Sequence, residues 1–262
     1  MIGAFHDPHE KLIRARWHLD CLDRSMEEFM ATHPRRLVGA VEDGKYRLRY
    51  QVVAEPPPGW GTVIGDCVHN LRSCLDHLVY QLTLTNLGEV LDDTSFPILE
   101  TEEAFDEKSH RDFSRGTWPI RGIQPDAQVA VEKLQPYHRK EGPHMDPLWL
   151  LNRLWNIDKH RLLHLAVIHP SGIGVSSSYQ LSDKPQSHSE IFTSGPWSDG
   201  DIVLEVDMPA GEEPPFDPFI ECQLVFDDSR SSEIIGPVVG TLTVLCDYVD
   251  KWVLPQFLPF LA

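Results

Sequence analysis

Hydrophobic residues recur at spacings of three and four in four long segments of the chain, which is the periodicity of amphipathic helices. The predicted helices cover residues near 9–31, 60–86, 147–165 and 235–257. His33-Pro34 suits the end of the first helix, because proline cannot continue it. Asp146 can cap the third helix, and Pro147 is tolerated at its first position. The pattern therefore predicts an antiparallel helical core.

Short runs rich in β-branched and aromatic residues predict strands between these helices. Asp43-Gly44 separates the first two runs and is a strong signal for a hairpin turn. The expected strands cover residues 36–42, 45–54, 163–169, 174–180, 201–208 and 219–226, and short helices are expected at 101–109 and 126–134. No linker separates two independent cores. We therefore predict a single α+β domain over residues 1–262, in which the helical core packs with an antiparallel sheet.

The composition is that of an ordinary globular protein, with 41% hydrophobic residues in a chain of 262. No run approaches the roughly 20 apolar residues of a membrane span. The formal charge of −17 argues against broad binding to DNA or to anionic membranes, because such binding needs concentrated Lys and Arg. No secretory signal is recognised, and the five cysteines form no C-x-x-C pair. A cytoplasmic location with reduced thiols is expected.

The helix predicted over residues 60–86 carries the densest set of reactive side chains, within the sequence His69-Asn70-Leu71-Arg72-Ser73-Cys74-Leu75-Asp76-His77. At about 100° per residue, one edge of its polar arc carries His69, Arg72, Asp76 and Tyr80, and the other edge carries Asn70, Ser73 and His77. This helix contains neither Lys nor Glu, although a solvated face is normally rich in both. We therefore expect its polar arc to be covered or to line a cavity.

A second concentrated polar surface is expected on the helix over residues 147–165. Four of its side chains follow one another at steps of four: Asn152, Asn156, His160 and His164. The chain has 13 histidines, and they cluster around these two helices. Because binding residues are expected where the two polar surfaces meet, the candidate binding residues are His69, Asn70, Asn156, Asp158 and His160.

Arg72 and His77 are separated by four residues on one predicted helix, and this R-x4-H arrangement resembles the motif of the HEPN superfamily. Many members of that superfamily are metal-independent ribonucleases that act as toxins or in defence. The resemblance implies that Arg72 stabilises phosphate charge and that His77 acts in acid–base chemistry on RNA, with no cofactor. Asp76, which lies between them, completes the candidate catalytic set.

The same resemblance implies a homodimer. Residues five apart lie about 140° from each other around a helix, so one copy of the motif spreads Arg72 and His77 apart. Two such helices paired about a twofold axis can bring each arginine near the partner's histidine. The run around Arg72 and the sequence Asn156-Ile157-Asp158-Lys159-His160-Arg161 are also similar to bacterial proteins of unassigned activity.

Two other interpretations of these residues are open. In one, a metal ion lies between the two helices and serves a metal-dependent enzyme, with ligands drawn from His77, Asp158, His160 and His164, and from His69 and Asp76. In the other, the cluster is a buried ion network that fixes how the helices meet, since Arg72 and Asp76 are four residues apart on one helix. The protein is then a non-catalytic module that binds a small molecule or another protein.

A binding module of that kind can hold its ligand elsewhere. One place is under the aromatic-rich loop around Phe96, Phe105, Phe113 and Trp118. The most basic local patch is Tyr137-His138-Arg139-Lys140, which is expected in a surface loop and could touch phosphate.

Overall fold

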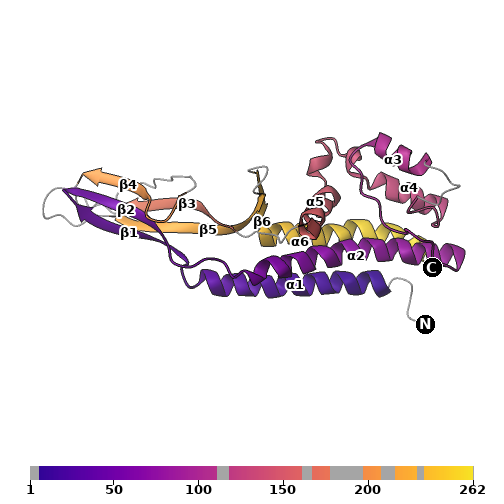
Figure 1. Ribbon diagram of the computed structural model, residues 1–262, viewed down its shortest axis with the longest axis horizontal. Coiled ribbons are helices and arrows are strands. Elements are labelled where there is room, and N and C mark those ends of the chain that lie inside the picture. Colours follow the sequence, from indigo (N-terminus) through magenta and orange to yellow (C-terminus); the bar gives the residue numbers. More distant parts are fainter. Residues whose placement is uncertain are drawn as a thin grey trace, which may run out of the picture. The chain divides into compact units, whose positions relative to one another are not determined.

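The computed structural model describes residues 6–110, 118–160, 167–177, 197–207, 216–228 and 233–261, and Figure 1 shows its elements. The chain forms two compact units, each assembled from separate stretches of sequence. The helical unit comprises Met1–Asp23, Gly59–His164 and Val239–Ala262, and the strand unit comprises Arg24–Pro58 and Leu165–Val238. The α+β fold class is confirmed. The prediction of a single domain over residues 1–262 stays a prediction.

The long predicted helices are present. They are α1 (His6–Met30), α2 (Gly59–Leu87), α5 (Pro147–His160) and α6 (Val238–Tyr248), joined by the short helices α3 (Glu102–His110) and α4 (Pro125–Lys133). Single turns lie at η1 (Pro136–His138) and η2 (Pro143–Met145), and α6 continues into a π-helical turn η3 (Val249–Val253) and a 3-10 helix η4 (Leu254–Phe260). The expected end of the third helix, residues 161–165, lies outside the described residues.

Helix α2 is the centre of the helical unit. Leu71, Leu75 and Leu78 are completely buried, and the cysteines Cys67 and Cys74 are buried beside them. The helix packs against α5, and Gln81 Nε2 donates a hydrogen bond of 3.1 Å to Asp7 on α1. Of the polar arc of α2, Arg72 is buried and Asp76 is half-buried, whereas His69 and Tyr80 are exposed, so the expected covering holds for only part of the arc.

An ion pair joins the two helices that flank α2 in the helical unit. Arg16 Nη2 on α1 lies 2.9 Å from Asp247 Oδ1 on α6 and 2.9 Å from Asp250 Oδ2 on η3. All three side chains are about one-third exposed, so the pair is partly screened by water and its contribution is modest. The apolar contacts of α2 therefore supply most of the packing energy of this unit.

The strand unit contains two antiparallel sheets. Strands β1 (Arg35–Glu42), β2 (Lys45–Val52) and β4 (Ile202–Asp207) form one sheet in the order β1-β2-β4, and β3 (Val167–Ser177), β5 (Phe216–Asp228) and β6 (Glu233–Pro237) form the other in the order β3-β5-β6. The predicted hairpin is confirmed, because Glu42 pairs with Lys45 across the turn.

Two strand predictions were wrong in detail. Residues 167–169 and 174–177 of the runs expected separately at 163–169 and 174–180 belong to one continuous strand, β3, because Pro170 and Gly172 lie at a register shift instead of a turn. Residues 163–166 and 178–180 lie outside the described residues. The last helix was expected to begin near residue 235, but Glu233–Pro237 is the edge strand β6 and α6 begins at Val238. Apolar runs of this length have no periodicity that separates strand from helix.

Gly39 in β1 is required by a cross-strand aromatic contact. A Cβ atom at this position would lie 2.5 Å from Cζ of Tyr46, whose side chain is only 5% exposed. Together with Leu48, Tyr46 forms a small apolar core of the sheet. The tyrosine ring therefore occupies the space that any larger residue at Gly39 would need.

We expect Gly39→Ala to lower the free energy of unfolding by about 1–3 kcal/mol, because the buried Tyr46 ring has to shift to admit a methyl group. Urea denaturation followed by circular dichroism measures the change. Gly59→Ala is the matched control, since nothing lies within 4 Å of its added Cβ. Equal stability of the Gly39 variant and wild type would contradict this packing.

Candidate functional site

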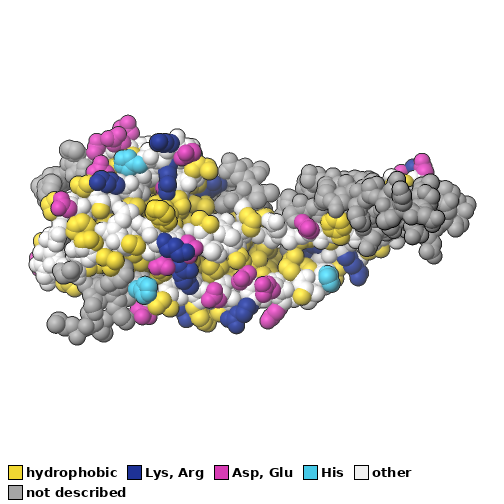
Figure 2. All heavy atoms as spheres, turned by 180° about the vertical axis from the view of Figure 1, so that it is seen from behind, with side chains coloured by type: hydrophobic (Ala, Val, Ile, Leu, Met, Phe, Trp, Pro, Cys, Tyr) yellow, Lys and Arg dark blue, Asp and Glu magenta, His cyan; other side chains and the backbone are white. Residues whose placement is uncertain are grey.

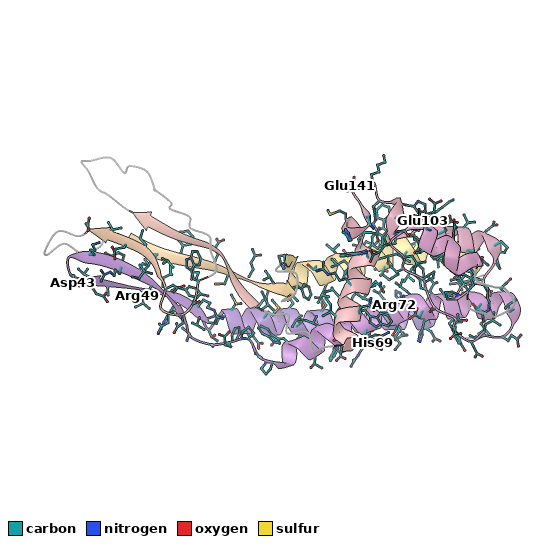
Figure 3. The ribbon with its side chains drawn as sticks, turned by 45° about the horizontal axis from the view of Figure 1, so that its top comes forward. Asp43, Arg49, His69, Arg72, Glu103 and Glu141 are labelled. Carbon is teal, nitrogen blue, oxygen red and sulfur yellow. The ribbon has the colours of Figure 1, made fainter. Side chains whose placement is uncertain are left out.

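Arg72 is buried where α5 crosses α2, and Figure 3 shows it there together with His69. The residue is 7% exposed. Its Nη2 donates a hydrogen bond of 2.6 Å to the carbonyl oxygen of Phe96 and lies 3.1 Å from Asp76 Oδ1. Its guanidinium carbon lies 5.2 Å from the centre of the Trp155 ring on α5. The guanidinium is thus held between three segments of the helical unit.

Asp76 binds the other polar group of the same peptide segment. Its Oδ1 accepts a hydrogen bond of 2.9 Å from the backbone N–H of Phe96, whose side chain is completely buried. Arg72 and Asp76 therefore hold the carbonyl and the amide of one residue, 20 or more positions further along the chain. We call this arrangement the Phe96 clamp: Arg72, Asp76 and the backbone of Phe96.

Burial dominates the electrostatics of the clamp. It lowers the pKa of Arg72 despite the neighbouring carboxylate. It also raises the pKa of Asp76, although Arg72 and the hydrogen bond from Phe96 act in the opposite direction. Both shifts have the same cause, since removing the pair from water costs more than their mutual attraction returns. Arg72 Nε and Nη1 are buried without a hydrogen-bond partner among the described residues.

The remaining predicted site residues on α2 make none of the hydrogen bonds of the clamp. His77 is half-buried. His69 is exposed, and its Nε2 lies 3.4 Å from Ser73 Oγ one turn away. Asn70 Nδ2 donates to the carbonyl oxygen of Asp66 within the same helix. A serine beside a histidine suggests acyl transfer, but backbone N–H groups in a helix interior are already hydrogen-bonded and offer no oxyanion hole.

Helix α5 contributes Asp158 and Lys159 to this region. Burial raises the pKa of Asp158, and His69 partly opposes that shift. Lys159 Nζ lies 3.2 Å from the centre of the Trp155 ring, and Asn156 is exposed. The structure thus brings together some of the predicted residues of the two polar surfaces, around the guanidinium of Arg72.

The described side chains do not support the interpretation as a metal site. Within the described side chains, no group of three or more His, Cys, Asp or Glu is arranged to hold a metal ion. The side chain of His160 and all of His164 lie outside the described residues. The metal site that includes them stays a prediction.

The aromatic loop proposed as a ligand site is packed into the core. Phe96, Phe105 and Trp118 are at most 6% exposed, and the Phe105 and Trp118 rings meet edge to face with centroids 5.1 Å apart. Tyr137 extends this cluster, with its ring centroid 6.2 Å from that of Phe105. Phe113 lies outside the described residues. These aromatic side chains stabilise the fold beside the clamp.

A pocket of about 470 Å³ lies in the helical unit where the end of α4 and η1 face the last helical segments. We call it the Arg139 pocket. Its lining residues are Lys133, Leu134, Gln135, His138, Arg139, Asp146, Tyr248, Trp252 and Gln256. His138 and Arg139 belong to the basic patch noted in the sequence, whereas the three residues after position 247 had not been predicted. One of these three, Trp252, is unusual because its side chain is 66% exposed.

Hydrogen bonds hold one wall of the Arg139 pocket. Arg139 Nε lies 2.5 Å from Asp146 Oδ2, and its Nη2 donates to the hydroxyl of Tyr248 at 3.1 Å. The Asp146 carboxylate also caps α5 as predicted, since its Oδ1 accepts from the backbone N–H of Leu148 at 2.8 Å. The hydrogen bond that Arg139 donates to Asp146 raises the pKa of Arg139, which keeps that side chain charged.

Comparisons with known proteins do not assign this chain to a class. No family model, no curated protein and no solved structure matches it. None of the helices in the described ranges has the length and apolar character needed to cross a bilayer. On the face of the helical unit seen in Figure 2, Lys and Arg side chains are interspersed with Asp and Glu, so that face carries no continuous basic surface. The function must therefore be argued from the clamp and the pocket.

The raised pKa of Asp76 predicts a pH dependence. A carboxyl group whose pKa is higher in the folded than in the unfolded protein binds more protons when folded, so ionising it lowers stability. The quantity to follow is the difference between two free energies of unfolding, wild type minus Asp76→Asn. This difference should fall as the pH rises from about 4, the ordinary pKa of Asp, and then level off. Urea titrations between pH 3.5 and 7 measure this difference.

Asp158 is present in both proteins of that comparison, so its own raised pKa cancels. A difference that grows as the pH rises would mean that Arg72 lowers the pKa of Asp76 below its ordinary value. That result would contradict the dominance of burial in the clamp.

Proposed function

We propose that this protein binds a small molecule in the Arg139 pocket and that the Phe96 clamp is architectural. The observation that carries the proposal is the state of Arg72, which is 7% exposed and bound to a backbone carbonyl. Because the guanidinium is buried, a phosphate group could reach it only if the surrounding segments moved apart. The Arg139 pocket, by contrast, has a volume within the usual range of small-molecule sites, about 300–1,000 Å³.

A HEPN-like ribonuclease that acts as a homodimer is the second candidate. Two observations favour it: Arg72 Nε and Nη1 have unused hydrogen-bonding capacity, and His77 is only half-buried. If the segment around Phe96 opened on binding RNA, these nitrogens could hold a phosphate while His77 of a partner copy moved a proton. The two candidates predict different results for the same variants.

RNA cleavage in excess EDTA separates the two candidates. We expect no cleavage by wild type, and we expect Arg72→Ala to lose about 3–5 kcal/mol of stability because Asp76 is left as a half-buried charge without its partner. Arg14→Ala is the matched control and should cost under about 1 kcal/mol, since Arg14 is exposed and stacks on the Trp17 ring.

Cleavage that survives EDTA, and that is lost in folded Arg72→Lys and His77→Ala proteins, would support the ribonuclease and remove the architectural interpretation. Circular dichroism confirms that each variant is folded before its activity is compared.

Small-molecule binding can be tested without knowing the ligand. A panel of neutral, cationic and anionic molecules of drug-fragment size is screened by ligand-observed NMR against wild type, Trp252→Ala and the control Trp17→Ala. We expect binders whose signal is lost only with Trp252→Ala, because Trp252 lines the pocket and Trp17 lies on α1. If no binder of any class is found, or if both variants behave alike, the proposed function is wrong.

A further inference from the structure

We infer that the Arg139 pocket selects a ligand that joins a planar ring to a phosphate group, which is the chemistry of a nucleoside monophosphate. This inference rests on the proposed function of the same pocket and adds the class of ligand. It depends on three features of the lining: an excess of positive charge, an arginine held in one orientation, and an exposed tryptophan beside it.

The charge of the pocket is opposite to that of the whole chain. The chain carries a formal charge of −17, yet two basic residues, Lys133 and Arg139, share the lining with only one acidic residue, Asp146. Asp146 is 3% exposed, and both of its oxygens already accept hydrogen bonds, one from Leu148 and one from Arg139. Lys133 is exposed and makes no ion pair with another described residue. The accessible charge of the pocket is therefore cationic and suits an anion.

Arg139 is held in place for such an anion. The bonds from Nε to Asp146 and from Nη2 to Tyr248 fix the plane of the guanidinium, and its carbon lies 5.6 Å from the Tyr248 ring centre. The side chain remains 40% exposed, and its Nη1 donates to no described group. A planar guanidinium with a free edge is the preferred partner of phosphate oxygens.

Trp252 supplies a surface for a ring. It lies in the π-helical turn η3 and is 66% exposed, the second highest value among the large hydrophobic side chains described. Pro255 follows within four residues and lacks the N–H that would continue α-helical bonding to Lys251, which accounts for the irregular turn. Single π-helical turns occur often at functional sites. Nucleic-acid bases stack on exposed aromatic rings of this kind.

The combination restricts the ligand class. A neutral ring alone would leave the cations of the pocket without a partner, and inorganic phosphate alone would leave Trp252 bare. A molecule with a ring and a phosphate group can contact both Trp252 and the cationic side chains. The pocket volume of 470 Å³ is enough for one small ligand. The source is either a free nucleotide or the phosphorylated end of an RNA chain, which present the same chemistry.

Isothermal titration calorimetry with the full chain tests this inference with three probes: AMP, adenosine and inorganic phosphate. AMP should bind at least tenfold more tightly than either of the others. Lys133→Gln should weaken AMP binding about fivefold while its matched control, Lys140→Gln, changes it less than twofold, because Lys140 does not line the pocket. Trp252→Ala should weaken AMP and adenosine about tenfold, and Trp17→Ala should not.

The outcomes separate this inference from the proposed function. Equal binding of adenosine and AMP, or equal effects of Lys133→Gln and Lys140→Gln, would overturn the phosphate specificity while leaving a small-molecule site in place. No binding of the three probes would overturn the inference. The proposed function would fail with it only if the wider panel also yields no binder. A 5′-phosphorylated trinucleotide identifies the source: preference for AMP supports a free nucleotide, and preference for the trinucleotide supports an RNA end.

Discussion

The helical unit depends on a buried arginine whose main partner is a backbone carbonyl. Arg72 and Asp76 hold both polar groups of Phe96, and this fixes the segment that follows it against α2. Gln135, itself 1% exposed, then binds that segment twice, through the carbonyl oxygen of Pro97 and the N–H of Leu99. Since Gln135 lines the Arg139 pocket, the clamp also positions one wall of the pocket.

Under the proposed function, this connection lets residues typical of an active site support a binding pocket. Arg72, Asp76 and the neighbouring histidines contain the groups needed for phosphoryl chemistry, yet Arg72 is buried and bound to the backbone of Phe96. The desolvation that shifts the pKa values of Arg72 and Asp76 is a cost to stability, and the fold bears it to hold a loop without regular secondary structure. The more open Arg139 pocket is lined by Gln135, which binds the same loop at Pro97 and Leu99.

Sequence periodicity was sufficient for the long helices and the first hairpin, because α2 and the hairpin around Gly44 follow local rules. It failed where tertiary pairing decides, as in the bulge of β3 and the strand β6. The Arg72–Asp76 pair was predictable from its spacing of four, but Phe96 was not, since no local rule selects a carbonyl 24 residues away. The pocket draws its lining from three distant segments, so only its basic patch could be noticed beforehand.

Amide hydrogen exchange at Phe96, followed by NMR on the wild-type protein, tests the central claim most directly. If the clamp is architectural, the Phe96 N–H should exchange only through openings nearly as costly as global unfolding, like the amides in the middle of α2. Exchange as fast as that of an exposed loop would show that the segment opens readily. That result would contradict the account and make Arg72 accessible to a substrate.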